Sequence, residues 1–144
     1  MGMDEAQAKA AFEAALKEQR PEFGRFFLAR LYGLDFSYPE DRCEVEFEVR
    51  DFMFNPQGSL HGGVIAFVLD VSMGHLLNHT FGPGMTIEMR SQFLRPIGLG
   101  RARSEGRFLK QGRSLNFLEA RLHNPKGELA AVATSTWQLL NKPS

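Results

Sequence analysis

This chain of 144 residues has almost no cysteine and no excess of charge of either sign. Its one cysteine, Cys43, cannot form a disulfide within the chain, and 17 basic residues balance 17 acidic residues. A neutral chain lacks the long-range positive field with which proteins attract nucleic acids or anionic membranes. We therefore expect no nucleic-acid or membrane partner, and any ligand must be recognised by local groups.

Long apolar runs are also scarce. The longest, around residues 63–77, is interrupted by Asp70 and falls short of the ~20 apolar residues that cross a bilayer. The N-terminus lacks the basic and then apolar pattern of a signal peptide. Together with the single cysteine, these absences predict a cytoplasmic protein.

Formal charge is absent from residues 52–87 except at Asp70. The surrounding run, VIAFVLDVSMGHLL, is apolar on almost every side of a helix, and such a helix is normally buried. An unpaired carboxylate in a buried helix is costly or takes up a proton. Asp70 is therefore either matched by polar partners from elsewhere in the fold or kept for chemistry.

The segment before this helix, NPQGSLHGG at residues 55–63, is a glycine-bearing loop. It should leave the first backbone N–H groups of the helix free, and the helix dipole makes them an electropositive site. Gly62 and Gly63 would let a ligand approach these groups closely. Taken alone, the two glycines fit close packing equally well, and Asn55 before Pro56 is typical of an ordinary turn.

The whole pattern predicts a single domain over residues 1–144, with an N-terminal helix within residues 1–20 and a core over 21–140. Residues 21–26 could add a helical turn, and residues 28–50 should form two strands joined at a turn over 38–42. The buried helix should span about 61–78. Four further strands should follow, over residues 85–97, 102–111, 114–124 and 128–140. Consecutive strands form antiparallel sheets, so we predict an α+β fold whose sheet wraps around the central helix.

Four features together carry a family resemblance: the spacing N-x5-H-G-G that begins at Asn55, the acid Asp70 eight residues after Gly62, the T-x9-P spacing from Thr86 to Pro96, and the GELAAVATSTWQLL strand. This pattern resembles the hotdog-fold acyl-CoA thioesterases, in particular the phenylacetate-degradation branch, over about residues 20–140. The resemblance implies hydrolysis of the thioester of a small acyl- or aryl-acyl-coenzyme A, without a metal or other cofactor.

Motif position implies the catalytic roles. Asp70 would be the base or nucleophile, and Gly62 would donate its backbone N–H to the thioester carbonyl. Asn55 would hold the attacking water or the carbonyl, and Thr86 would orient the Asp70 carboxylate or the water. His61 would shape the helix start. Each has a simpler alternative, since Thr86 also fits strand propensity and Asp70 also fits a structural acid.

Substrate binding is predicted at Gly63 and at three basic residues, Arg90, Lys110 and Arg113. In the family the coenzyme lies near these strands, so the basic side chains could contact its phosphates. Basic residues of this kind are more often solvated charges of a strand edge.

The spacing of Gly62 and Asp70 also predicts an assembly. Eight residues at 1.5 Å each place them about 12 Å apart along the helix axis, too far to act on one carbonyl. Two chains must then share each site, with Gly62 of one chain near Asp70 of the other. The resemblance implies the same arrangement, so we expect a homo-oligomer, either a dimer or a dimer of dimers.

Two other functions are compatible with this fold. One is an acyl-thioester hydratase or dehydratase, but these more often pair a histidine with the acid, and His75 lies five positions after Asp70. The other is a non-catalytic acyl-CoA-binding module. His75 and His79 have the i, i+4 spacing of a zinc pair, but no suitable third ligand accompanies them, so no metal site is predicted.

Overall fold

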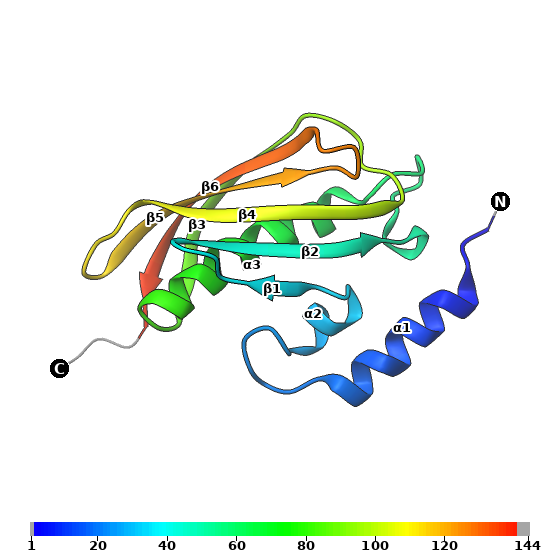
Figure 1. Ribbon diagram of the computed structural model, residues 1–144, viewed down its shortest axis with the longest axis horizontal. Coiled ribbons are helices and arrows are strands. Elements are labelled where there is room, and N and C mark those ends of the chain that lie inside the picture. The colour runs from blue at the N-terminus through cyan, green and yellow to red at the C-terminus, as the bar shows by residue number, and fades with distance from the viewer. Residues whose placement is uncertain (1, 141–144) are drawn as a thin grey trace.

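The computed structural model describes residues 2–140. Its helices and strands follow one another in the order that Figure 1 shows. The elements are α1 (Glu5–Glu18), α2 (Phe27–Leu31), β1 (Asp35–Ser37), β2 (Arg42–Val49), the 3-10 helix η1 (Asp51–Met53), α3 (Gly62–Thr80), β3 (Gly84–Phe93), β4 (Gly100–Lys110), β5 (Leu115–His123) and β6 (Leu129–Leu139).

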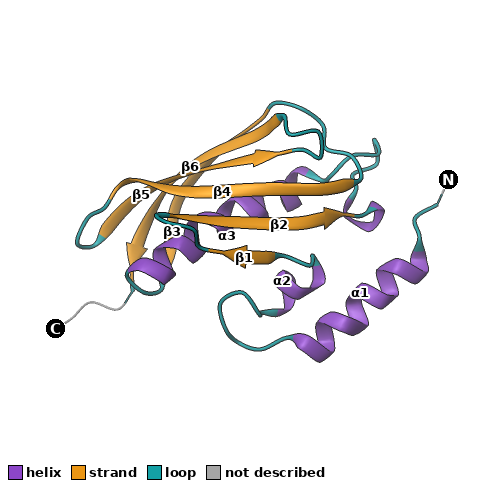
Figure 2. Cartoon of the chain, in the orientation of Figure 1, coloured by secondary structure: helices purple, strands orange, loops and turns teal. Residues whose placement is uncertain are grey.

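The six strands form one sheet in the order β1-β2-β4-β5-β6-β3, and every neighbouring pair is antiparallel. The long helix α3 lies along one face of the sheet and contacts β2 to β6 (Figure 2). This is the predicted α+β architecture, an antiparallel sheet wrapped around a central helix, and the prediction is confirmed. This strand order places β3 at one edge of the sheet and β1 at the other.

Side chains alternate between the two faces of the sheet, as the strand period requires. On β5, Leu118, Ala120 and Leu122 are buried toward α3, whereas Arg121 is exposed on the outer face. The helix lies very close to β4 at Gly106, where an added Cβ would lie 2.5 Å from the backbone oxygen of Ser72. This close approach requires glycine and fixes how α3 sits on the sheet.

The first predicted strand is shorter than the sequence suggested. Part of its predicted length lies in α2, which ends where Gly33 adopts a φ of +64°. The Gly33 and Leu34 N–H groups then donate to the carbonyls of Arg30 and Ala29. Ala29 and Leu34 are both fully buried, so core packing selects a helical turn where the sequence pattern favoured a strand. The predicted turn over 38–42 does join β1 to β2.

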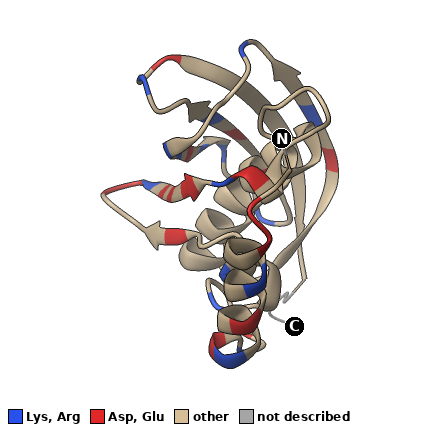
Figure 3. Cartoon of the chain, turned by 90° about the vertical axis from the view of Figure 1, so that its right-hand side faces the viewer, with Lys and Arg blue, Asp and Glu red and all other residues tan. Residues whose placement is uncertain are grey.

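The N-terminal helix is confirmed as α1, which begins at Asp4, whose side chain accepts a hydrogen bond from the Gln7 N–H. It lies beside α2 near the β1 edge, and Phe12 meets Phe27 edge-to-face at 5.8 Å (Figure 1). Charges of both signs are interspersed along the helix and the strands (Figure 3). No helix among residues 2–140 is long and apolar enough to cross a membrane.

Candidate active site

Asp70 is the one residue between Val68 and Leu77 that is only half-buried, and the others are buried. The sequence pattern predicted a helix buried on every side, and the structure corrects that prediction at this position. The Asp70 Oδ1 accepts a hydrogen bond from Thr86 Oγ1 at 2.9 Å, so β3 supplies the polar partner. Burial raises the pKa of Asp70 above its ordinary value of 3.8, and the Thr86 hydrogen bond opposes that rise.

The Asp70 side chain lines a mostly apolar pocket of about 400 Å³. The pocket lies between α3, the last strand β6 and the segment that joins α1 to α2. Besides Asp70, its lining residues are Pro21, Glu22, Phe23, Phe26, Phe67, Val71, Gly74, His75 and Trp137. A carboxylate at the edge of an apolar, concave site is poorly hydrated, and such sites are where perturbed acids take part in chemistry.

At the start of α3, His61 is the N-cap residue. Its Nδ1 accepts a hydrogen bond from the Gly63 N–H at 2.8 Å. The prediction that the first N–H groups of this helix are free is therefore wrong for Gly63. Among the described residues, the Gly62 N–H donates to no other group. The helix start thus presents one free donor, on the residue predicted to hold the carbonyl.

The N-cap hydrogen bond of His61 explains why residue 63 is a glycine. An added Cβ there would lie 3.1 Å from Nδ1 of His61, and the cap would have to shift. A Cβ on Gly62 would meet only the Phe93 ring at 3.7 Å, an ordinary contact. The two glycines therefore differ, since Gly63 accommodates the cap and Gly62 leaves a donor exposed.

Asn55 closes the loop before α3. Its Oδ1 accepts from the Ser59 N–H at 3.2 Å, and its Nδ2 donates to Ser59 Oγ at 3.2 Å. Gly58 in this loop has a φ of +89°. Within one chain, the Asn55 amide thus shapes the loop.

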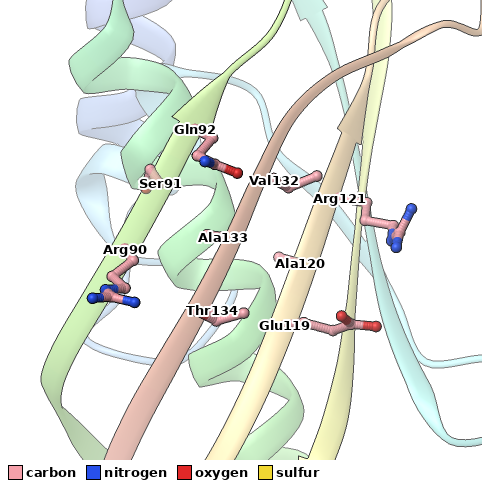
Figure 4. A pocket seen from close by; sticks show the side chains of 9 residues that line it. All are labelled: Arg90, Ser91, Gln92, Glu119, Ala120, Arg121, Val132, Ala133 and Thr134. Atoms are coloured by element: carbon pink, nitrogen blue, oxygen red, sulfur yellow. The ribbon is translucent and has the colours of Figure 1, made fainter.

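Arg90 lies on the outer face of the sheet, opposite α3 (Figure 4). It belongs to a shallow hollow of about 580 Å³ whose other polar members include Glu119, Arg121 and Thr134. Asp70 and its pocket lie on the helix face. The structure therefore does not bring Arg90 together with Asp70 within one chain.

Lys110 and Arg113 lie exposed at the hairpin between β4 and β5. This hairpin lies at the C-terminal end of α3. The ring of Phe108, on β4, packs against the ring of Phe81, the C-cap residue of α3, with their centroids 5.7 Å apart. Gly62 is at the opposite end of the helix. Within one chain, these basic residues and the free N–H donor lie at opposite ends of the molecule.

The two histidines with zinc-pair spacing have other partners. The His75 Nε2 accepts a hydrogen bond from the Gly24 N–H at 2.8 Å, and His79 stacks on Tyr38 at 4.1 Å. Over residues 2–140, no three His, Cys, Asp or Glu side chains gather as a metal site would need. Cys43 is fully buried, and burial raises the pKa of its thiol to about 12, so the thiol stays protonated.

Sequence reasoning did not identify the aromatic wall of the Asp70 pocket. Phe23 and Phe26 come from a connecting segment far from α3 in the sequence, and Trp137 comes from the last strand. The spacing of thirteen phenylalanines gave no sign of which ones meet Asp70. The one available signal was Gly74 in the middle of the helix, where an added Cβ would lie 2.5 Å from the Trp137 ring.

Comparison with known proteins identifies the family to which the chain belongs. A family model described as the thioesterase superfamily matches residues 57–131. The SSO2140 protein of Saccharolobus solfataricus, provisionally named an esterase, is 30% identical over 102 residues, which cover 69% of this chain and 72% of that protein.

Solved structures share the fold. The BH2602 protein of Bacillus halodurans, crystallised with CoA, superimposes with a TM-score of 0.85 at 24% identity, covering 99% of this chain and 97% of that chain. The PaaI protein of Escherichia coli, from the phenylacetic acid degradation operon, has a TM-score of 0.79 at 18% identity, covering 92% and 97% of the two chains.

The fold and the family match define a thioester hydrolase with the hotdog architecture. This chain belongs to the thioesterase superfamily, and the predicted resemblance is confirmed. Thioester hydrolysis is therefore the general reaction that the comparisons support.

Proposed function

We propose that this protein hydrolyses the thioester of a small acyl- or aryl-acyl-coenzyme A, releasing the acid and free coenzyme A. The observation that carries the proposal is the Asp70 carboxylate, hydrogen-bonded to Thr86 and facing an apolar pocket of about 400 Å³. The pocket offers space and aromatic contacts for an acyl group beside an acid. The CoA bound to the Bacillus halodurans neighbour supports coenzyme A as the leaving group.

In this proposal Asp70 is the base or nucleophile, and Thr86 Oγ1 holds its carboxylate in place. The free Gly62 N–H, at the positive end of the α3 dipole, stabilises the negative charge that develops on the thioester oxygen. His61 keeps the helix start in shape through its cap to Gly63. Asn55 positions the loop beside it. Each residue of the predicted catalytic set thus has a role in this proposal, and the proposed reaction uses no metal or cofactor.

The proposal requires two chains for each site, because Gly62 and Asp70 lie about 12 Å apart along one helix. Strand β3 offers the surface for a second copy. It is an edge strand whose backbone has an unpaired side, and Met85, Ile87 and Phe93 on it are each about half exposed. Apolar side chains on an exposed edge favour pairing with another strand. An isologous dimer about this edge would run the two α3 helices in opposite directions, so the helix end beside Lys110 and Arg113 would face the start of the partner's α3.

Subunit exchange tests the shared site with two inactive variants. Asp70→Asn removes the base, and Gly62→Pro removes the free N–H at the start of α3. Proline is suited to the first helical position, and His61 already has the extended backbone that precedes proline (φ −61°, ψ 135°). If Gly62 and Asp70 come from different chains, each mixed dimer has one intact site. Random exchange should restore roughly a quarter of wild-type thiol release.

The matched control is Gly62→Ala, which keeps the N–H and adds a Cβ at an ordinary distance from Phe93. It should retain most of the activity that Gly62→Pro loses. If folded, exchanged variants recover no activity, both groups act within one chain and the shared site is refuted. If the wild type binds acyl-CoA but releases no thiol, a non-catalytic binding module or a hydratase replaces the proposed hydrolase.

A further inference from the structure

One wall of the Asp70 pocket is made by residues of the segment 20–26, which lies between α1 and α2. The segment closes on itself, since the Arg20 N–H donates to the Arg25 carbonyl at 2.8 Å and the Arg25 N–H donates to the Glu22 carbonyl at 3.1 Å. It contributes Phe23 and Phe26 to the pocket. It is neither helix nor strand, so contacts with the rest of the protein must hold it in place.

One hydrogen bond joins this segment to α3. The Gly24 N–H donates to His75 Nε2 at 2.8 Å, across 51 positions of sequence. The residue that donates this hydrogen bond, Gly24, has a φ of +80°, a backbone conformation that favours glycine. Because Nε2 accepts, the imidazole is neutral and carries its proton on Nδ1.

The imidazole of His75 is buried among three aromatic rings. The face of the imidazole stacks on the Phe36 ring, with the centroids 4.2 Å apart and an angle of 11° between the ring planes. The ring centroids of Phe23 and Phe26 lie 5.0 and 5.9 Å from that of the imidazole. Only 3% of its surface is exposed. The same ring therefore lines the pocket, fixes the segment by a hydrogen bond and supports both phenylalanines of the wall. A buried polar group of this kind costs free energy unless its partners are in place.

We propose that His75 is a positioning residue, which holds residues 20–26 against α3 and so sets the fit of bulky acyl groups beside Asp70. This inference rests on the proposed hydrolase function. His75 acts on the substrate through Phe23 and Phe26, not on the thioester itself. Loss of the Gly24 hydrogen bond should loosen the wall, weakening binding of a large acyl group and leaving a small one almost unaffected.

The test compares His75→Leu, which cannot accept a hydrogen bond, with His75→Gln, whose amide oxygen can. The control is His79→Leu, one turn further along α3, which removes a stacked histidine of similar size outside the pocket. Each variant is assayed with phenylacetyl-CoA and with acetyl-CoA. We expect His75→Leu to raise KM for phenylacetyl-CoA about tenfold with kcat nearly unchanged. KM for acetyl-CoA should change little, and His75→Gln should restore most of the difference.

A second readout does not depend on activity. Hydrogen exchange of the Gly24 amide should be slow in the wild type and in His75→Gln, and fast in His75→Leu. Equal losses on both substrates, or unchanged kinetics and exchange in folded His75→Leu, would overturn the positioning role. If the wild type hydrolyses neither substrate, the proposed function fails, and the exchange experiment still decides whether His75 holds the segment.

Discussion

At β5 and β6 the two faces of the sheet differ in polarity, since one face is mainly apolar and the other is polar and charged. Toward α3 the strands present Ala120, Ala133 and Trp137, and the hollow there is apolar and contains Asp70. Toward the outside they present Glu119 and other polar groups around a larger hollow of about 580 Å³ (Figure 4). The larger hollow has more room, but its charged groups stay in contact with water. A half-buried acid with a raised pKa, rather than pocket volume, distinguishes the face suited to catalysis.

The largest expected difference between the faces is catalytic. Asp70→Asn should lower kcat about a hundredfold or more, the scale of losing a base or nucleophile. Asparagine keeps an Oδ1 that can accept from Thr86, so the fold should survive. Thiol release from an acyl-CoA measures the loss, and Arg121→Ala on the outer face is the control. Near-normal turnover in a folded Asp70→Asn protein would remove Asp70 from the mechanism.

Packing on the helix face should also be far less tolerant than exposed surface. Gly106→Ala should destabilise the protein by about 1–3 kcal/mol, because the new Cβ meets backbone of α3 that cannot move alone. Gly98→Ala, an exposed glycine with open space around it, is the matched control. Denaturant unfolding measures both. Equal stabilities would show that α3 does not approach the sheet as closely as described.

The pH dependence of Asp70 sharpens the comparison further. Because burial raises its pKa above 3.8, activity should rise with pH through an inflection above that value. The folded state keeps this proton to a higher pH than the unfolded state does, so Asp70 should lower stability as pH rises through the same range. At neutral pH, Asp70→Asn should therefore melt at the same temperature or higher. A variant that melts distinctly lower would contradict a raised pKa.

The smallest effects are expected from the basic residues. Lys110→Ala and Arg113→Ala should raise KM for acyl-CoA a few-fold and leave a short pantetheine thioester unaffected, because phosphate contacts contribute mainly uniform binding. Arg90→Ala should change KM least of the three, since Arg90 could reach the coenzyme only around the β3 edge. Steady-state kinetics with both substrates measure these changes. A larger effect from Arg90→Ala would assign the coenzyme phosphates to the outer face.

The sequence by itself determined the elements and the candidate acid. Period-two alternation predicted β2, and strand-like stretches separated by turn residues predicted the four strands after α3. The apolar run with a single carboxylate predicted both the central helix and Asp70. These signals are local, so they can be read along the chain. Local pattern also misplaced one element, because α2 is helical only through the burial of Ala29 and Leu34.

Only the tertiary structure decided which groups meet. The Gly24 N–H reaches His75 across 51 positions, a contact that no sequence pattern indicated. The Thr86 hydroxyl reaches Asp70 across 16 positions, a contact that the residues alone left open and that only the family resemblance implied. The tertiary structure also separated Gly62, whose N–H is free, from Gly63, whose N–H is capped by His61. Such pairings depend on how the strands and α3 pack, and this packing results from many contacts between residues that are far apart in the sequence. Residue types along a chain specify what chemistry is available, whereas the fold decides which of it acts together.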